Sequence, residues 1–257
     1  MPRRPAITIV RNLAAGVGAA LLLAPGLALA GPPYLTDDPE PTDTGHWEVY
    51  NFLGGTKGAD GLGGEAGLDL NYGAAKDVQL TLVLPVGYSA RGYSLSGLQA
   101  GGGVIEAAAK IKLLHQAEGG GGWEPDLAVF PRLFVPTDTN FGPAHINLFL
   151  PVWVGKDFGK WSLFGGGGYD INPAPEGRNF WQGGIAISRA LGERASLGAE
   201  VWRQGADAPG APGTTTVNVG ATWRFTKHWS LIGSAGPSFI DGGRHGSAFY
   251  IALKLDD

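Results

Sequence analysis

The chain has 257 residues, a formal net charge of −4, 44 glycines and no cysteine. Without cysteine it has no disulfides, thiol catalysis or thiolate metal sites, and its acidic balance argues against nucleic acid as a partner. Abundant glycine disfavours helix interiors, and the chain lacks long amphipathic segments at helical spacing, so an all-β protein is indicated.

The N-terminus has the pattern of a secretory signal peptide. Residues 13–28 are almost continuously apolar and follow a basic start made by Arg3, Arg4 and Arg11. Ala28-Leu29-Ala30 has the A-x-A form at which such peptides are cleaved, so we expect cleavage after Ala30. A membrane anchor or a buried helix is the alternative, but the apolar core is short and Pro-Gly interrupts it.

Residues 64–88 carry the clearest pattern in the chain. Every second residue is apolar from Ala66 to Tyr72 and again from Val78 to Tyr88, with mostly polar residues between them. Period two in two runs joined by a turn at residues 73–77 predicts a β-hairpin with one apolar face. Each run is about ten residues long, which is the length that a tilted strand needs to cross a bilayer.

The same alternation recurs as far as the C-terminus and predicts about twelve strands. The strands expected outside the hairpin cover residues 46–53, 104–114, 126–135, 145–154, 161–171, 180–189, 195–204, 214–225, 229–235 and 247–255. Short turns are expected at residues 73–77, 155–160, 190–194 and 226–228. Longer loops are expected at residues 89–102, 137–142, 172–178, 205–212 and 237–246, and residues 116–125 form a longer turn than the series predicts. This alternation is typical of outer-membrane barrels.

We therefore predict an all-β fold, a transmembrane antiparallel up-and-down β-barrel of about twelve strands with long extracellular loops and short periplasmic turns. Residues 1–30 are expected to be the signal peptide, residues 31–45 an irregular periplasmic N-terminal segment, and residues 46–257 the transmembrane β-barrel. A soluble β-sandwich or lipocalin-like barrel is the rival structure, but long strands with aromatic ends would make a poor soluble surface.

Most charged residues of the predicted strands occupy the alternate positions that face away from the apolar side of the strand. An arginine or lysine at the lipid-facing midplane costs ~2–4 kcal/mol, so charges are expected to face the lumen. The inward charges are Glu65, Asp69, Glu106, Lys110, Lys112, Arg132, Asp170, Glu200, Arg224 and Lys254. Arg189 and Arg203 face outward at strand ends, where the cost is small.

These charges predict an acidic outer vestibule above a basic periplasmic floor. On this basis Glu in place of Lys110 and Lys112 is expected to shift selectivity towards cations. Pairing of the charges across the lumen, which would close it, is the alternative.

Aromatic side chains also face inward on neighbouring strands. They are Phe130, Phe134, Phe149, Trp153, Phe164 and Trp202, and together they predict a contiguous aromatic wall in the lumen. Such a wall is either a track or pocket for an apolar or aromatic solute, or the simple filling of a narrow barrel. The sequence leaves both readings open.

Several short motifs recur in a known family of exported proteins. The matching residues are Thr36-Asp37-Asp38-Pro39-Glu40, Gly45-His46-Trp47-Glu48, Leu84-Pro85, Phe134-Val135-Pro136-Thr137 and residues 223–236. They resemble the MetA-pathway of phenol degradation family of outer-membrane, transporter-like β-barrels, although Val104 stands where such families often carry Asp. The resemblance implies a transporter-like barrel and carries over no site residue.

Residues with catalytic character are scattered. His145 and Asn147 share a face, but no serine nucleophile lies on that strand, and Asp37-Asp38 precede the barrel. The 5 histidines lack the spacing of a metal site. We therefore expect no enzyme activity, no catalytic, cofactor-binding or metal-binding residue, and no cofactor.

Near the C-terminus, residues 244–251 resemble the signal that the barrel assembly machinery reads, with Gly246, Phe249 and Ile251 at its marked positions. The expected partners are outer-membrane lipid and lipopolysaccharide, the barrel assembly machinery and a small-molecule solute, and the barrel is expected to be a monomer in the bacterial outer membrane. The predicted function is a channel or transporter for small solutes, aromatic or apolar ones included. A plugged structural or interaction barrel and an outer-membrane hydrolase are the alternatives, and the sequence leaves open whether residues 31–45 enter the lumen.

Overall fold

The computed structural model describes residues 33–58, 61–91, 97–117, 122–138, 140–141 and 145–257, and the predicted signal peptide with its cleavage site lies outside them. Within the described residues, fourteen strands form one antiparallel sheet. Their bounds are β1 (Trp47–Gly58), β2 (Gly61–Ala75), β3 (Val78–Arg91), β4 (Leu98–Gly102), β5 (Val104–Leu114), β6 (Asp126–Val129), β7 (Arg132–Pro136), β8 (Asn147–Phe158), β9 (Trp161–Ile171), β10 (Phe180–Ala190), β11 (Ala195–Gln204), β12 (Thr214–Arg224), β13 (Trp229–Ile240) and β14 (Arg244–Asp256).

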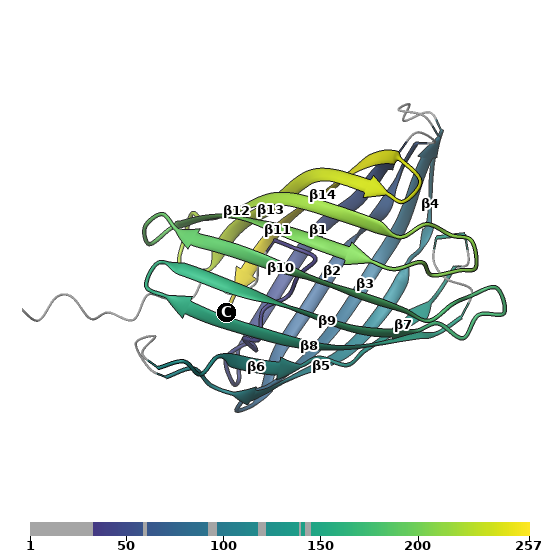
Figure 1. Cartoon of the computed structure of the whole chain (residues 1–257). Helices are drawn as coiled ribbons and strands as arrows, with labels where there is room; N and C mark the ends of the chain where they lie inside the picture. Colours follow the sequence, from purple (N-terminus) through teal and green to yellow (C-terminus); the bar gives the residue numbers. More distant parts are fainter. Residues whose placement is uncertain (1–32, 59–60, 92–96, 118–121, 139, 142–144) are drawn as a thin grey trace, which may run out of the picture.

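The sheet closes on itself into a barrel (Figure 1). The closing seam joins β1 to β14 in a register that runs from Glu48↔Asp256 to Lys57↔Ser247. β4 and β5 both pair with β3, and β6 and β7 both pair with β8. β4 and β5 therefore share one strand position in the barrel wall, and β6 and β7 share another. The predicted antiparallel barrel of about twelve strands is therefore confirmed.

Side-chain exposure alternates along the strands as the register predicts. On β3, Leu80, Leu82 and Leu84 are 40–50% exposed, whereas Gln79 and Thr81 are only 6–7% exposed. Exposed leucines beside a buried glutamine and threonine are the reverse of a soluble protein's arrangement. They are the arrangement expected where lipid contacts the outside of a barrel and the lumen is polar. None of the described residues forms a helix long and apolar enough to cross a bilayer.

Two predicted elements are wrong in detail near β4 and β6. β4 lies within residues 89–102, which were expected to be a loop, and it pairs with the end of β3. The predicted strand at residues 126–135 is interrupted at Phe130 and Pro131, because proline has no N–H to donate to a ladder. The Phe130 N–H instead donates to the carbonyl oxygen of Pro151, at 3.1 Å.

Several connections are also tighter than predicted. β13 and β14 extend through most of the expected loop at residues 237–246 and leave a turn in which Gly242 and Gly243 have φ of 88° and 85°. β2 and β8 likewise extend into the expected turns at residues 73–77 and 155–160. The hairpin turn after β2 is reduced to two residues, with Asp77 at φ 64°.

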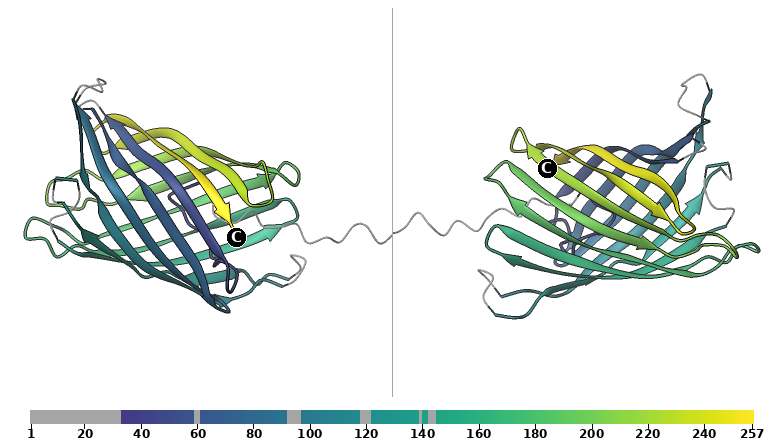
Figure 2. Two further views of the ribbon diagram at one scale, coloured as in Figure 1. Left: turned by 180° about the vertical axis from the view of Figure 1, so that it is seen from behind. Right: turned by 45° about the horizontal axis from the view of Figure 1, so that its top comes forward.

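The segment before β1 runs inside the barrel, as the purple trace in Figures 1 and 2 shows. At the short-turn rim, the Gly45 N–H donates to the Gly73 carbonyl at 2.7 Å. Near the middle of β13, the Ser234 hydroxyl donates to the Pro33 carbonyl. Residues 33–45 therefore cross the lumen, and we refer to them as the plug.

Candidate functional site

Glu200 of β11 is the deepest anchor of the plug. The residue is 2% exposed, and its carboxylate accepts hydrogen bonds from the Leu35 N–H at 3.1 Å, the Thr36 N–H at 2.9 Å and the Thr36 hydroxyl at 2.8 Å. The Asn218 amide donates a further hydrogen bond at 2.7 Å. A buried carboxylate is tolerated only when donors replace water, and here most of the donors belong to the plug.

Inward-facing glycines provide the space that the plug occupies. A Cβ on Gly220 would lie 2.6 Å from Cε1 of Tyr34, and one on Gly155 would lie 2.8 Å from Cδ of Pro39. A Cβ on Gly184 would lie 2.4 Å from the Thr36 hydroxyl oxygen. The Tyr34 hydroxyl also donates to the Gly220 carbonyl at 3.3 Å. The barrel wall is thus shaped for the plug along β8, β10 and β12.

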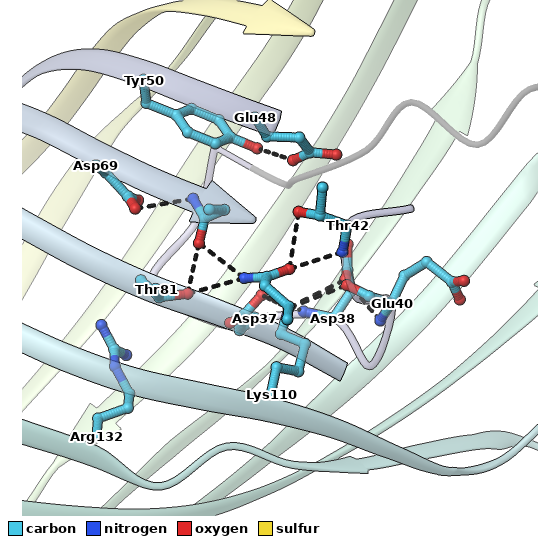
Figure 3. Close-up of polar contacts among 12 residues, drawn as sticks. Asp37, Asp38, Glu40, Thr42, Glu48, Tyr50, Asp69, Thr81, Lys110 and Arg132 are labelled. Carbon is cyan, nitrogen blue, oxygen red and sulfur yellow. Dashed lines mark hydrogen bonds and ion pairs between the residues drawn. The ribbon is translucent and has the colours of Figure 1, made fainter. Parts of the chain in front are cut away.

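Two buried lysines of β5, Lys110 and Lys112, hold the acidic part of the plug, and Figure 3 shows Lys110 beside Asp37 and Asp38. The Lys110 ammonium lies 3.0 Å from an Asp37 carboxylate oxygen and 3.7 Å from one of Asp38, and it also donates to the Glu40 carbonyl at 3.2 Å. Lys112 forms an ion pair with the Glu40 carboxylate. Because both lysine side chains are only 5–6% exposed, these ion pairs keep the buried ammonium groups compensated.

The enclosure of the plug also changes the proton affinity of its own groups. Burial raises the pKa of the Asp38 carboxyl to about 6; Lys110 opposes this shift, and neighbouring Asp37 adds to it. Burial likewise raises the pKa of the Tyr34 hydroxyl above its ordinary value, and the charge of Glu200 adds to the shift. Tyr34 therefore remains a hydrogen-bond donor at every physiological pH.

A neutral hydrogen-bond network fixes the plug at the rim. The Thr42 N–H and hydroxyl donate to the Gln79 side-chain oxygen at 2.8 and 3.0 Å. The Gln79 amide in turn donates to Asn71 at 2.7 Å and to Thr81 at 3.0 Å (Figure 3). This end is held by neutral and backbone hydrogen bonds, whereas the part inside the lumen also has charged partners in Glu200, Lys110 and Lys112.

The predicted aromatic wall is largely brought together. Phe130, Phe149, Trp153 and Trp202 form one buried cluster, and Phe134 packs against it. The Trp153 and Trp202 rings stack with their centroids 6.3 Å apart. The remaining member, Phe164, is buried but faces the plug, with its ring centroid 6.3 Å from that of Tyr34.

The plug lies between two cavities. The larger, of about 610 Å³, has Pro33, Tyr34 and Leu35 of the plug at one side. Its aromatic lining includes Phe52, Phe134, Phe149, Trp202 and Tyr250, and its polar groups include Thr216, Asn218, Ser234 and Ser238. The smaller, of about 270 Å³, is lined by Tyr34 and Leu35 again, by Lys110 and Arg132, and by the plug's Asp37, Asp38 and Glu40. Ligand pockets typically have volumes of ≈ 300–1,000 Å³ and are lined mainly by apolar groups, which the larger cavity matches.

The other predicted lumen charges are mostly paired or hydrogen-bonded. Arg132 binds Glu106 through two hydrogen bonds of 2.7 Å, and Lys254 lies 3.2 Å from Glu48 and 2.7 Å from Asp256. The remaining acids accept hydrogen bonds: Asp69 from Asn71, Asp170 from Asn147 and Gln182, and Glu65 from the Val104 N–H. Arg224 stands apart, because its Nε has no hydrogen-bond partner among the described residues.

The residues singled out for other roles lie elsewhere. Gly246, Phe249 and Ile251 all lie on β14, where Gly246 faces Ser238 of β13. His145 is exposed just before β8. Sequence reasoning missed Tyr34 and three glycines that contact the plug, Gly155, Gly184 and Gly220, which we call the glycine seat. Inward-facing glycines on alternate strands are themselves a signal that a segment approaches closely.

Comparison with known proteins extends the description of the fold. No protein-family model matches the chain, and no curated protein matches it either. The solved structure of the COG4313 outer membrane channel from Pseudomonas putida F1 is similar with a TM-score of 0.69 and 16% identity, over 86% of this chain and 98% of that one. The KdgM porin is similar with a TM-score of 0.52 and 9% identity, over 82% and 98%. At these identities the likeness shows the fold alone, that of an outer-membrane β-barrel.

Proposed function

We propose that the protein is a channel or transporter of the bacterial outer membrane for small solutes, aromatic or apolar ones included, and that the plug closes it. The observation that carries this proposal is the cavity of about 610 Å³, lined by aromatic side chains and bounded by a segment of the chain itself. A lumen merely filled by large side chains would not retain such a space. The ion pairs of Lys110 and Lys112 hold only residues 37–40 of the plug, so they can break and re-form while the strands of the barrel stay paired.

The membrane location rests on the exposed apolar belt of the strands. Membership of the MetA-pathway of phenol degradation family is part of the same proposal, and the motif Thr36 to Glu40 that supports it lies in the plug. The two similar structures are described as a channel and a porin, which fits a transport role better than an enzymatic one. We accordingly propose no catalytic function, and expect lipopolysaccharide and the barrel assembly machinery as partners.

The short turns are proposed to face the periplasm. Lys227 is exposed in the turn between β12 and β13, so an amine reagent that does not cross the outer membrane should leave it unlabelled in intact cells. Labelling of Lys227 in intact cells with a sealed barrel would mean that the assigned polarity is inverted.

A permanently closed structural barrel is the second candidate, because the plug occupies the lumen in the structure. Single-channel recording in planar bilayers separates the two. We expect brief openings for the full chain and a higher open fraction for the neutral-plug variant Asp37→Asn/Asp38→Asn/Glu40→Gln, which removes the ion pairs to Lys110 and Lys112. Silence of both proteins, each shown to be folded by heat-modifiable migration, would favour the structural barrel.

A further inference from the structure

Lys110 differs from the other paired cations of the barrel wall in where its carboxylate partners lie. Arg132 is paired with Glu106 and Lys254 with Glu48, and Lys112 has Asp126 at 2.9 Å besides its plug partner. Those partners all belong to the wall. In the part of the chain that the structure describes, the carboxylates within 4 Å of the Lys110 ammonium are those of Asp37 and Asp38, and both belong to the plug.

Departure of the plug would leave Lys110 as a lumen-facing ammonium without a carboxylate partner. With the plug docked its side chain is 5% exposed, and the centroid of the Phe130 ring lies 5.1 Å from the ammonium nitrogen. An unpaired cation in a narrow lumen with low-dielectric walls attracts anions, so an anion in the lumen would bind at this position. The ring supplies an apolar surface directly beside the ammonium group.

Resting on the proposed transport function, we propose that Lys110 is the binding site for the carboxylate of an organic acid with an apolar or aromatic body. The plug then acts as an internal competitor, because Asp37 and Asp38 place the same chemical group on the same ammonium. The solute that opens the lumen is the one that replaces those carboxylates at Lys110 while its body contacts Phe130 and the aromatic cluster.

The surroundings of Lys110 restrict the charge of that solute. The cavity of about 270 Å³ beside it is also lined by the wall acids Glu48, Asp69 and Glu106. Glu48 and Glu106 are neutralised by Lys254 and Arg132, whereas Asp69 accepts a hydrogen bond only from the neutral Asn71 amide among the described residues. A second negative charge in this cavity would be repelled by Asp69, so a monocarboxylate is favoured over a dicarboxylate.

The test is a binding measurement on the purified, signal-free barrel in detergent at pH 7.5, by isothermal titration. The probes are benzoate, the neutral benzyl alcohol, the cationic benzylamine and the dianion phthalate. The proteins are the wild type, the neutral-plug variant, and that variant combined with Lys110→Met, with Lys110→Arg or, as the matched control, with Lys227→Met in an exposed turn.

We expect benzoate to bind the neutral-plug variant at least tenfold more tightly than the wild type, and more tightly than the other three probes. Lys110→Met should lower benzoate affinity at least tenfold and leave benzyl alcohol unchanged, whereas Lys110→Arg and Lys227→Met should retain benzoate binding. Equal affinities for benzoate and benzyl alcohol, or benzoate binding that survives Lys110→Met, would overturn the proposal. If the neutral-plug variant does not assemble, Gly220→Val provides a displaced plug without a change of charge.

This outcome is independent of the recordings described above. Benzoate binding that depends on Lys110 in a barrel that never conducts would refute the channel and retain the anion site. Conductance without such binding would refute the anion site and retain the channel.

Discussion

Gly220→Val tests whether the glycine seat holds the plug. The three atoms nearest to a Cβ at this position all belong to the plug: Cε1 and Cζ of Tyr34 at 2.6 and 3.0 Å, and Cγ of Pro33 at 2.9 Å. Carbon atoms ordinarily pack ≈ 3.5–4.0 Å apart, so Tyr34 must retreat by about 1 Å. Overpacking of this kind costs roughly 1–3 kcal/mol, which corresponds to a shift of about 5- to 150-fold towards the released plug.

Thiol labelling measures that shift directly, because the natural chain contains no cysteine. Thr36→Cys places a thiol at a position that is 0% exposed while the plug is docked, so its rate of reaction with a maleimide reports the released fraction. We expect a 5- to 150-fold faster reaction when Gly220→Val is added. Gly63→Val is the control, since the nearest atom to its Cβ lies at an ordinary 3.6 Å. An unchanged rate in a folded Gly220→Val barrel would refute the argument that the seat holds the plug.

Three further outcomes follow from the described contacts. Glu106→Gln should lower the free energy of unfolding of the barrel by roughly 3–5 kcal/mol, because Arg132 loses its buried partner. Urea titration in detergent measures this loss, with Asp241→Asn in the exposed pair with Arg203 as the control. A smaller loss for Glu106→Gln than for the control would contradict the prediction. Docking of the plug should strengthen by about tenfold from pH 7.5 to pH 5, since the pKa of Asp38 is about 6 when docked and 3.8 when released, so the docked state binds the proton more tightly. Unlike the neutral-plug variant, this protonation leaves the contacts of Asp37 with Lys110 and of Glu40 with Lys112 in place. Maleimide labelling of Thr36→Cys, corrected with a thiol peptide, should therefore slow at pH 5, and faster labelling would contradict the prediction. Gly246→Asp/Phe249→Asp should reduce the yield of heat-modifiable protein, and normal yield would disprove an assembly role for these residues.

The barrel could be predicted because the residue pattern that specifies it lies within each strand. The alternation of apolar and polar residues, and the positions of charges such as Glu106 and Lys110 within it, can be read from each strand by itself. They identify which face of the strand meets lipid and which meets the lumen. The interruption at Pro131 was also readable in principle, since a proline within a central strand argues against an unbroken ladder. The strand β4 was not, because its small residues carry no alternation.

The plug could not be derived from the sequence because its contacts are remote. Thr36 and Glu200 are 164 positions apart, and nothing near either residue indicates the other. The same contacts change one earlier expectation. Glu in place of Lys110 and Lys112 would now repel Asp37, Asp38 and Glu40, so the first effect expected is loss of the plug, and any change of ion selectivity would follow from it.

The position of the plug ahead of β1 has a consequence for the order of folding. Pro33 finds its partner Ser234 across 201 positions, and the β1–β14 seam likewise joins the two ends of the barrel. Closing so long a loop has an entropic cost, so contacts of this kind form late. Residues 33–45 are thus the first part of the described chain to be synthesised and the last that can find all of their partners.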